Sequence, residues 1–201
     1  MQPAFAKATA GRRSPKGALH AGRQTVSKDG NGTVSVFGHS GVREGEPAYE
    51  LALSAGRRLA ELGYAVACGG YGGAMEAAAR GAKEAGGRTI GVTCAIWKSR
   101  ANRFIDECVQ TDSLDLRVAR LMEIGRGGYV VLPGGTGTLR ELATVWEALS
   151  IKAILGRPLV CMGSFWRPLV EMMASARPGC EECVALVDRA EELDEFFPAV
   201  R

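Results

Sequence analysis

Short apolar runs alternate with longer helical stretches along the chain from residue 33 onward. The runs are rich in Val and other strand-forming residues, and most end close to a glycine, which is typical of buried strands. They predict strands over residues 33–37, 64–68, 88–93, 128–132, 158–162 and 184–187, with a further short strand near 108–110.

The stretches between these runs have the spacing of amphipathic helices. Pro47 opens a helix over 47–62 whose leucines fall on one face, and Gly63 follows it. Other helices are predicted over 114–124, 136–150, 165–176 and 189–197, and an Ala-rich one ends near residue 86. Because strands and helices alternate, we expect parallel strands joined by right-handed crossovers. The predicted fold class is therefore an α/β doubly wound parallel sheet, Rossmann-like, with helices on both faces.

Charge divides the chain into a basic N-terminal segment and a mildly acidic body. Residues 1–28 contain six basic and no acidic residues, so leaving them out changes the net charge from +3 to −3. We expect residues 1–30 to be a disordered basic extension, with an organelle-targeting segment as the alternative, and 31–201 to be one nucleotide-binding domain. Nucleic acid is not an expected partner of an acidic body, because its binding requires phosphate neutralisation.

Hydropathy and cysteine usage point to a cytoplasmic protein. No apolar run approaches the roughly 20 residues that cross a bilayer, so no membrane association is expected. Cys180 and Cys183 have the spacing of a metal or redox pair, but no second Cys or His pair accompanies them. With no secretory signal either, we predict a reducing cytoplasmic location and no metal site.

Three turns at predicted strand ends consist of small residues: 38–41, 69–73 and 134–138. Ligands of an open parallel sheet bind beyond the carboxyl ends of its strands. The last two turns lead directly into helices, whose N-terminal amides attract anions that glycine allows to approach closely. Thr136 and Thr138 add hydroxyl donors. These turns predict a phosphate site, the alternative being that the glycines only form tight connections.

The familiar cofactor motifs are missing. No Gly-x4-Gly-Lys-Ser/Thr string occurs, which disfavours ATP or GTP hydrolysis. In the two candidate Gly-x-Gly-x-x-Gly strings, Met75 and Arg140 occupy the third glycine position, which disfavours NAD. No pattern indicates a pyridoxal-phosphate lysine. We therefore expect no cofactor.

The segment Pro133-Gly134-Gly135-Thr136-Gly137-Thr138-Leu139-Arg140-Glu141 matches the pattern PGGxGTxxE and resembles the signature of the Lonely Guy (LOG) family. Residues 69–75 resemble that family's second glycine loop, and the likeness extends over about 33–175. The resemblance implies a nucleoside 5′-monophosphate phosphoribohydrolase, which splits AMP or a cytokinin riboside 5′-monophosphate into free base and ribose 5-phosphate. The substrate- and phosphate-binding residues expected from the turns and the resemblance are Gly38, Ser40, Gly70, Gly72, Gly73, Met75, Gly134, Gly135, Thr136, Gly137 and Thr138.

The resemblance also implies a catalytic pair, formed by the glutamate of the motif and an arginine of the preceding helix. These are Glu141 and Arg117 here, with Arg120 as the alternative arginine. A carboxylate suits the reaction, because breaking a C1′–N bond places positive charge on the sugar. The alternative function predicted from the same glycine loops is that of a non-hydrolytic carrier, which binds a nucleotide or a phosphorylated cofactor such as the molybdenum cofactor.

A homodimer is expected as well. Family members usually form one, and helices 114–126 and 136–150 carry more apolar residues than one sheet face obviously needs. These residues are Leu116, Leu121, Met122, Ile124, Val145, Trp146 and Leu149.

Overall fold

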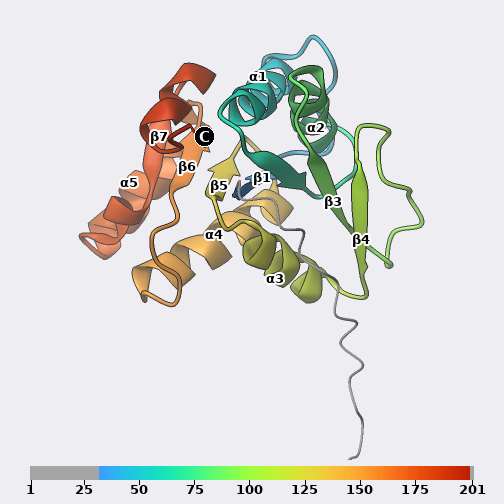
Figure 1. Ribbon diagram of the computed structural model, residues 1–201. Helices are drawn as coiled ribbons and strands as arrows, with labels where there is room; N and C mark the ends of the chain where they lie inside the picture. Colours follow the sequence, from blue (N-terminus) through green and yellow to red (C-terminus); the bar gives the residue numbers. More distant parts are fainter. Residues whose placement is uncertain (1–31, 200–201) are drawn as a thin grey trace, which may run out of the picture.

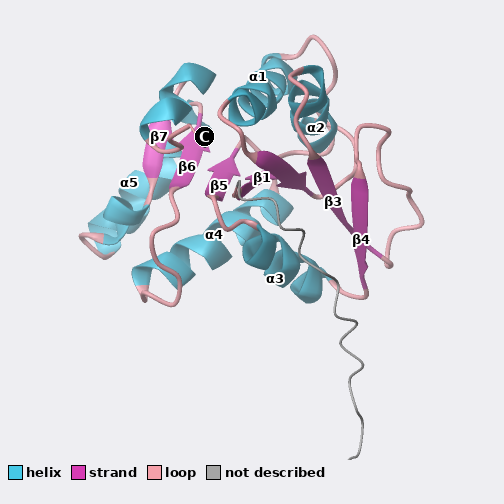
Figure 2. Ribbon diagram, viewed as in Figure 1, coloured by secondary structure: helices cyan, strands magenta, loops and turns pink. Residues whose placement is uncertain are grey.

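The computed structural model describes residues 32–199 as one seven-stranded parallel sheet covered by helices on both faces (Figures 1 and 2). The predicted α/β doubly wound fold is confirmed, whereas the extension predicted for residues 1–30 lies outside the described residues. The strands are β1 (Thr33–Phe37), β2 (Ala65–Cys68), β3 (Thr89–Cys94), β4 (Glu107–Thr111), β5 (Gly128–Val131), β6 (Leu159–Met162) and β7 (Ala185–Val187). Their order in the sheet is β4-β3-β2-β1-β5-β6-β7.

The helices form one layer on each face of this sheet. One layer consists of α1 (Pro47–Glu61), α2 (Ala74–Glu84) and the 3₁₀ helix η3 (Ala190–Glu195). The other consists of α3 (Leu114–Ile124), α4 (Thr136–Ser150) and α5 (Arg167–Ala176), with the short 3₁₀ helices η1 (Ser164–Trp166) and η2 (Cys180–Cys183) beside them. In Figure 1 the first layer lies above the sheet and α3 and α4 lie below it.

Alternation along the central strands divides the core between these layers. In β1, Val34 and Val36 pack toward α1 and α2, and Phe37 packs toward α3 and α4. Ser35 points to the same side as Phe37, and its hydroxyl donates to the Leu121 carbonyl at 2.7 Å. β1 is therefore buried on both faces, and this hydrogen bond satisfies the one polar side chain in its interior.

The structure corrects the type and the length of the last helix. The C-terminal segment is a 3₁₀ helix over Ala190–Glu195 instead of an α-helix over 189–197, with a Phe196 N–H to Leu193 carbonyl bond of the i to i+3 type at 3.0 Å. Pro198 follows and has no N–H with which to extend the helix.

The apolar residues assigned to a subunit interface belong mostly to the core of the single chain. Leu121, Val145 and Trp146 are buried against the sheet, and Met122, Ile124 and Leu149 pack partly against the same cluster. Only Leu116 of that set is largely exposed, at 53%. The argument for an interface from these residues is therefore wrong, and the homodimer stays a prediction that needs another surface.

Among residues 32–199, no helix combines the length and apolar character needed to cross a membrane.

Candidate active site

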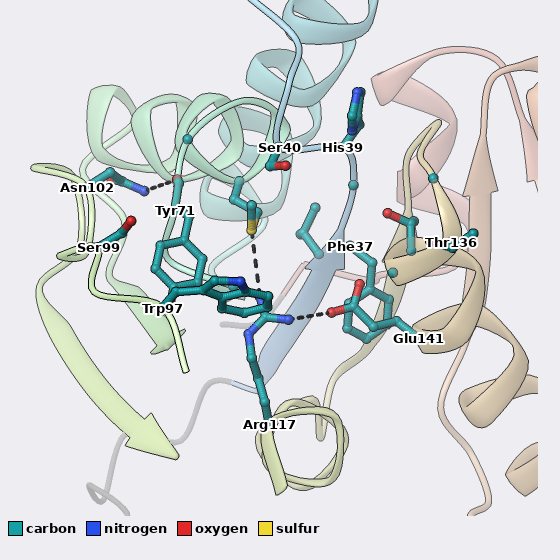
Figure 3. A pocket seen from close by; sticks show the side chains of 18 of the residues that line it. Phe37, His39, Ser40, Tyr71, Trp97, Ser99, Asn102, Arg117, Thr136 and Glu141 are labelled. Carbon is teal, nitrogen blue, oxygen red and sulfur yellow. Dashed lines mark hydrogen bonds and ion pairs between the residues drawn. The ribbon is translucent and has the colours of Figure 1, made fainter. Parts of the chain in front are cut away.

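A cavity of about 600 Å³ opens where the strand order reverses, at the carboxyl ends of β1 and β5. From β1 the chain adds strands in one direction through β4, and β5 then pairs with the other side of β1. Such a reversal separates the crossover connections on the two sides and leaves a crevice. The side chains that surround it come from the ends of β1 and β2, the loop after β3, and helices α3 and α4 (Figure 3).

The three small-residue turns meet at this crevice through backbone hydrogen bonds. The His39 N–H donates to the Pro133 carbonyl at 3.3 Å, and the Ala74 N–H donates to the His39 carbonyl at 2.8 Å. Gly73 has a φ of +68°, and a side chain there would collide with the Ser40 backbone. Glycine is therefore required at the point where α2 begins against the first turn.

The turn from Gly134 to Thr138 presents the N-terminus of α4 to the cavity. The first amides of an α-helix have no partner within the helix, so they can bind an anion. The predicted residues that line the cavity are Gly38, Ser40, Gly72, Met75, Gly135, Thr136, Gly137, Thr138, Arg117 and Glu141. Three others, Gly70, Gly73 and Gly134, lie behind this lining, and Gly134 is packed against the Thr138 side chain.

Arg117 and Glu141 form a buried ion pair at the floor of the cavity. Arg117 Nη1 donates to Glu141 Oε1 at 3.1 Å, and the two residues are only 8% and 7% exposed. Arg117 Nε donates to the Val92 carbonyl at 2.8 Å, and its Nη2 lies 3.8 Å from the Met75 sulfur. A side chain at Gly69 would collide with this guanidinium, so the strand end must be glycine for Arg117 to lie there.

Burial raises the pKa of Glu141 to about 7, while the charges of Arg117 and Arg140 oppose the rise. A carboxyl group with this pKa is poised to exchange a proton near neutral pH. Arg120 lies elsewhere, in an ion pair with Glu123 at 2.7 Å. Of the two arginines proposed from the sequence, Arg117 is the one that the fold brings to Glu141.

The sequence reasoning missed the wall opposite the α4 turn. Tyr71, Trp97, Ser99, Arg100 and Asn102 line this wall. Cys94 fixes the Tyr71 hydroxyl, which accepts from its N–H at 2.9 Å and lies 3.2 Å from its carbonyl. The segment after β3 is irregular and gives no periodic signal, although a tyrosine inside a glycine turn was a visible cue.

Across residues 32–199, no three His, Cys, Asp or Glu side chains gather to hold a metal ion. The polar groups of the cavity are instead suited to an anionic organic ligand, with helix amides at one side and a guanidinium–carboxylate pair at the floor.

Comparison with known proteins connects this geometry to a family. Residues 31–177 match the family described as the SLOG cluster4 family. A cytokinin riboside 5′-monophosphate phosphoribohydrolase of Mycobacterium tuberculosis is 35% identical over 120 residues, which are 58% of this chain and 63% of that protein. The matched part thus covers less than two thirds of that relative's length.

Solved structures share the fold at lower identity. The molybdenum cofactor carrier protein of Chlamydomonas reinhardtii superposes with a TM-score of 0.62 at 23% identity, over 83% of this chain and 98% of that one. The molybdenum cofactor binding protein of Rippkaea orientalis gives a TM-score of 0.65 at 21% identity, over 82% of this chain and 94% of that one.

Proposed function

The chain belongs to the SLOG cluster4 family, and on that premise we propose that it is a nucleoside 5′-monophosphate phosphoribohydrolase. The reaction hydrolyses the N-glycosidic bond of AMP or of a cytokinin riboside 5′-monophosphate to the free base and ribose 5-phosphate. The name of the mycobacterial relative supports this reaction type.

The phosphate would bind at the α4 turn. The amides of Thr136, Gly137 and Thr138 point from the helix N-terminus, and the exposed Thr136 hydroxyl faces the cavity (Figure 3). Charge-assisted hydrogen bonds from backbone amides suit a dianionic phosphate, and the helix dipole adds to them.

The sugar would then lie over the buried pair. Glu141 follows Thr138 by one turn of α4, so its carboxylate is within a sugar's length of the anion site. In the reaction, water adds its hydroxyl group to C1′, and the base nitrogen keeps the electrons of the broken bond and takes up a proton. The ionised Glu141 stabilises the cationic sugar and can accept the proton of the water, while Arg117 holds the carboxylate in place.

The observation that carries this proposal is the buried carboxylate. Removing a carboxylate from water costs several kcal/mol even when it is paired, and a negative charge beside a phosphate site weakens anion binding. A protein that only carries a phosphorylated ligand gains nothing from such a group, whereas N-glycoside cleavage needs one.

The carrier reading is the second candidate, and the shared fold with the two molybdenum cofactor proteins is its support. Both readings use the glycine turns, and they differ only in whether a bond is broken. Turnover therefore has to be measured together with binding.

The test titrates the protein with AMP and adenosine by calorimetry and follows base release by chromatography. Two charge-assisted hydrogen bonds of about 1.5 kcal/mol each predict that AMP binds roughly 100-fold more tightly than adenosine. Equal affinities would refute the phosphate site. Tight binding of AMP without base release from any of several monophosphates would make the protein a carrier.

Gly135→Val tests the position of the phosphate. Gly135 has a φ of −90°, and a β-carbon placed there meets no atom within 4 Å, so the fold tolerates a side chain that fills the anion position. AMP binding should be lost while the melting temperature is kept. The matched control Ala143→Val, on an exposed part of the same helix, should bind AMP like the wild type.

A further inference from the structure

The polar and aromatic groups of the cavity follow one another in the order of the parts of a nucleotide. The α4 turn lies at one side, and Glu141 comes one helical turn beyond it. Arg117 is next, 3.1 Å from Glu141, and its guanidinium carbon lies 5.7 Å from the centre of the Trp97 ring and 5.9 Å from that of Tyr71. Figure 3 shows Thr136 and Glu141 on one side of the Arg117 head group and the two aromatic residues on the other. A phosphate on the turn and a sugar over the pair would leave the base against the aromatic wall.

The loop between β3 and β4 builds this wall and is fastened to the second glycine turn. The side-chain amide of Asn102 donates to the carbonyls of Gly70 and Tyr71, at 3.2 and 2.8 Å. Its oxygen accepts the Phe104 N–H at 3.0 Å, so the amide nitrogen is engaged with the turn and the amide oxygen with the loop. The fastening holds the Trp97 ring edge-to-face with Tyr71, at 5.4 Å between ring centres.

Trp97 keeps a large free surface in spite of these contacts. It is 42% exposed and lines the cavity. A large aromatic ring that is held in place and open to a cavity offers a stacking surface for a planar base.

The polar groups at this end of the cavity are mostly donors. Arg100 is exposed, lines the cavity, and has no ion-pair partner among the described residues. Glu141 supplies the only carboxylate of the described lining, and it is engaged with Arg117. Since the Asn102 amide is also engaged, Arg100 and the Ser99 hydroxyl remain to meet the edge of a base.

We propose that Trp97 stacks on the base and Arg100 reads its edge, so that 6-oxopurine monophosphates are preferred over adenine monophosphates. This rests on the reaction and the phosphate site of the proposed function, but it replaces AMP and the cytokinin nucleotides by inosine and guanosine monophosphates as the preferred substrates. Inosine and guanosine monophosphates present O6 and N7 as adjacent acceptors, which match the two parallel donors of a guanidinium. Adenine replaces O6 by an amino group that donates, so one of the two contacts becomes repulsive, and an N6 substituent adds bulk there.

Calorimetry with IMP, GMP, AMP and N6-isopentenyl-AMP tests the proposal on the full chain. A bidentate contact predicts that the wild type binds IMP and GMP about 10-fold more tightly than AMP. Arg100→Ala should bring the affinities of IMP and AMP within roughly twofold of each other. Lys98→Ala removes an exposed charge from the same loop outside the cavity lining, and it should keep the wild-type preference. Trp97→Leu should lower the affinity for all four nucleotides by roughly 5- to 100-fold.

Stronger binding of AMP or N6-isopentenyl-AMP than of IMP by the wild type overturns the proposal, as does an Arg100→Ala variant that keeps the wild-type ratio. Base release is measured on the same samples and reports separately on the proposed function. An IMP preference that depends on Arg100, without release of hypoxanthine, supports the base site and refutes the hydrolase. Base release with no preference among purines refutes the base site and keeps the hydrolase, and failure to bind any of the four nucleotides refutes both.

Discussion

Glu141→Gln separates the charge of the carboxylate from its shape. Glutamine keeps an oxygen that can accept from Arg117 Nη1, and Arg117 Nε keeps its bond to the Val92 carbonyl. The buried negative charge at the floor of the cavity is the property that is removed. Because the pKa of Glu141 is raised to about 7, the comparison belongs at about pH 8, where most wild-type molecules carry the charge.

The size of the effect follows from the burial of the pair. Two unit charges about 4 Å apart interact by about 4 kcal/mol at an effective dielectric constant near 20. Loss of one preorganised electrostatic contact in other active sites slows turnover by about 10²–10³-fold, or roughly 3–4 kcal/mol. The two figures agree, so we expect base release from AMP to fall by about 10²–10³-fold in Glu141→Gln.

The affinity for AMP should change little, because a carboxylate gains nothing from a neutral sugar and slightly repels the phosphate. Base release by chromatography and AMP binding by calorimetry are measured on both proteins, with thermal unfolding as the control for folding. Glutamine leaves Arg117 without a counter-charge but also removes the cost of burying an anion, so the melting temperature should shift by only about 5 °C. A Gln variant as fast as the wild type would remove Glu141 from the mechanism.

The arginines, the pH dependence of turnover and of stability, and the assembly give four further tests. Arg117→Ala should weaken AMP binding and lower turnover by roughly 10²-fold or more. Arg120→Ala breaks only the outer pair with Glu123 and should change neither; losses as large in Arg120→Ala as in Arg117→Ala would refute the choice of Arg117. The kcat/KM for AMP should rise with pH to a plateau above about 7, and this limb should be absent in Glu141→Gln. The stability of the fold should show the opposite trend. Because the folded-state pKa of Glu141 lies above the ordinary 4.5, the stability that its proton confers is present below pH 4.5 and is lost as pH rises through about 7. Urea unfolding that depends on pH in the same way for wild type and Glu141→Gln would contradict this. If the chain forms the expected homodimer through the exposed Leu114, Leu116 and Leu139, which are 37%, 53% and 38% exposed, Leu116→Asp should halve the mass seen by light scattering, and a monomeric wild type would refute it.

Local patterns in the sequence were sufficient for the fold and for half of the site. Buried strands such as β5 and β6 read as apolar runs because both of their faces are covered. The glycine turns stood out because small residues gather where β2 and β5 end. Glu141 was identified as the glutamate of the family motif, and its position three residues after Thr138 supported that role. Arg117 came from the same resemblance, and its selection over Arg120 required the fold.

Contacts between distant segments could not be read from the sequence. The wall formed by Tyr71, Trp97 and Arg100 depends on Asn102 fastening an irregular loop to a turn more than 30 residues earlier, and no periodicity reports such a bond. The apolar faces of α3 and α4 were misassigned for a related reason. A helix pattern shows that one face is buried, but it does not tell whether a sheet of the same chain or a second subunit covers it.

The packing around Arg117 bears on the choice between hydrolysis and carriage. The guanidinium fits beside the end of β2 because residue 69 is a glycine. It also donates to the Val92 carbonyl of β3 and lies against the Met75 sulfur at the start of α2. Three elements thus contact one buried cation, whose charged partner is Glu141. If small apolar residues replaced the pair, the cavity would still be open to a phosphate ligand. Replacing a buried ion pair by apolar groups is often neutral or stabilising, so stability alone does not account for the arrangement. The net charge of this costly buried pair is close to zero, so the pair as a whole does not strengthen anion binding, and this supports the proposed hydrolysis, in which positive charge would develop on a sugar bound above the pair.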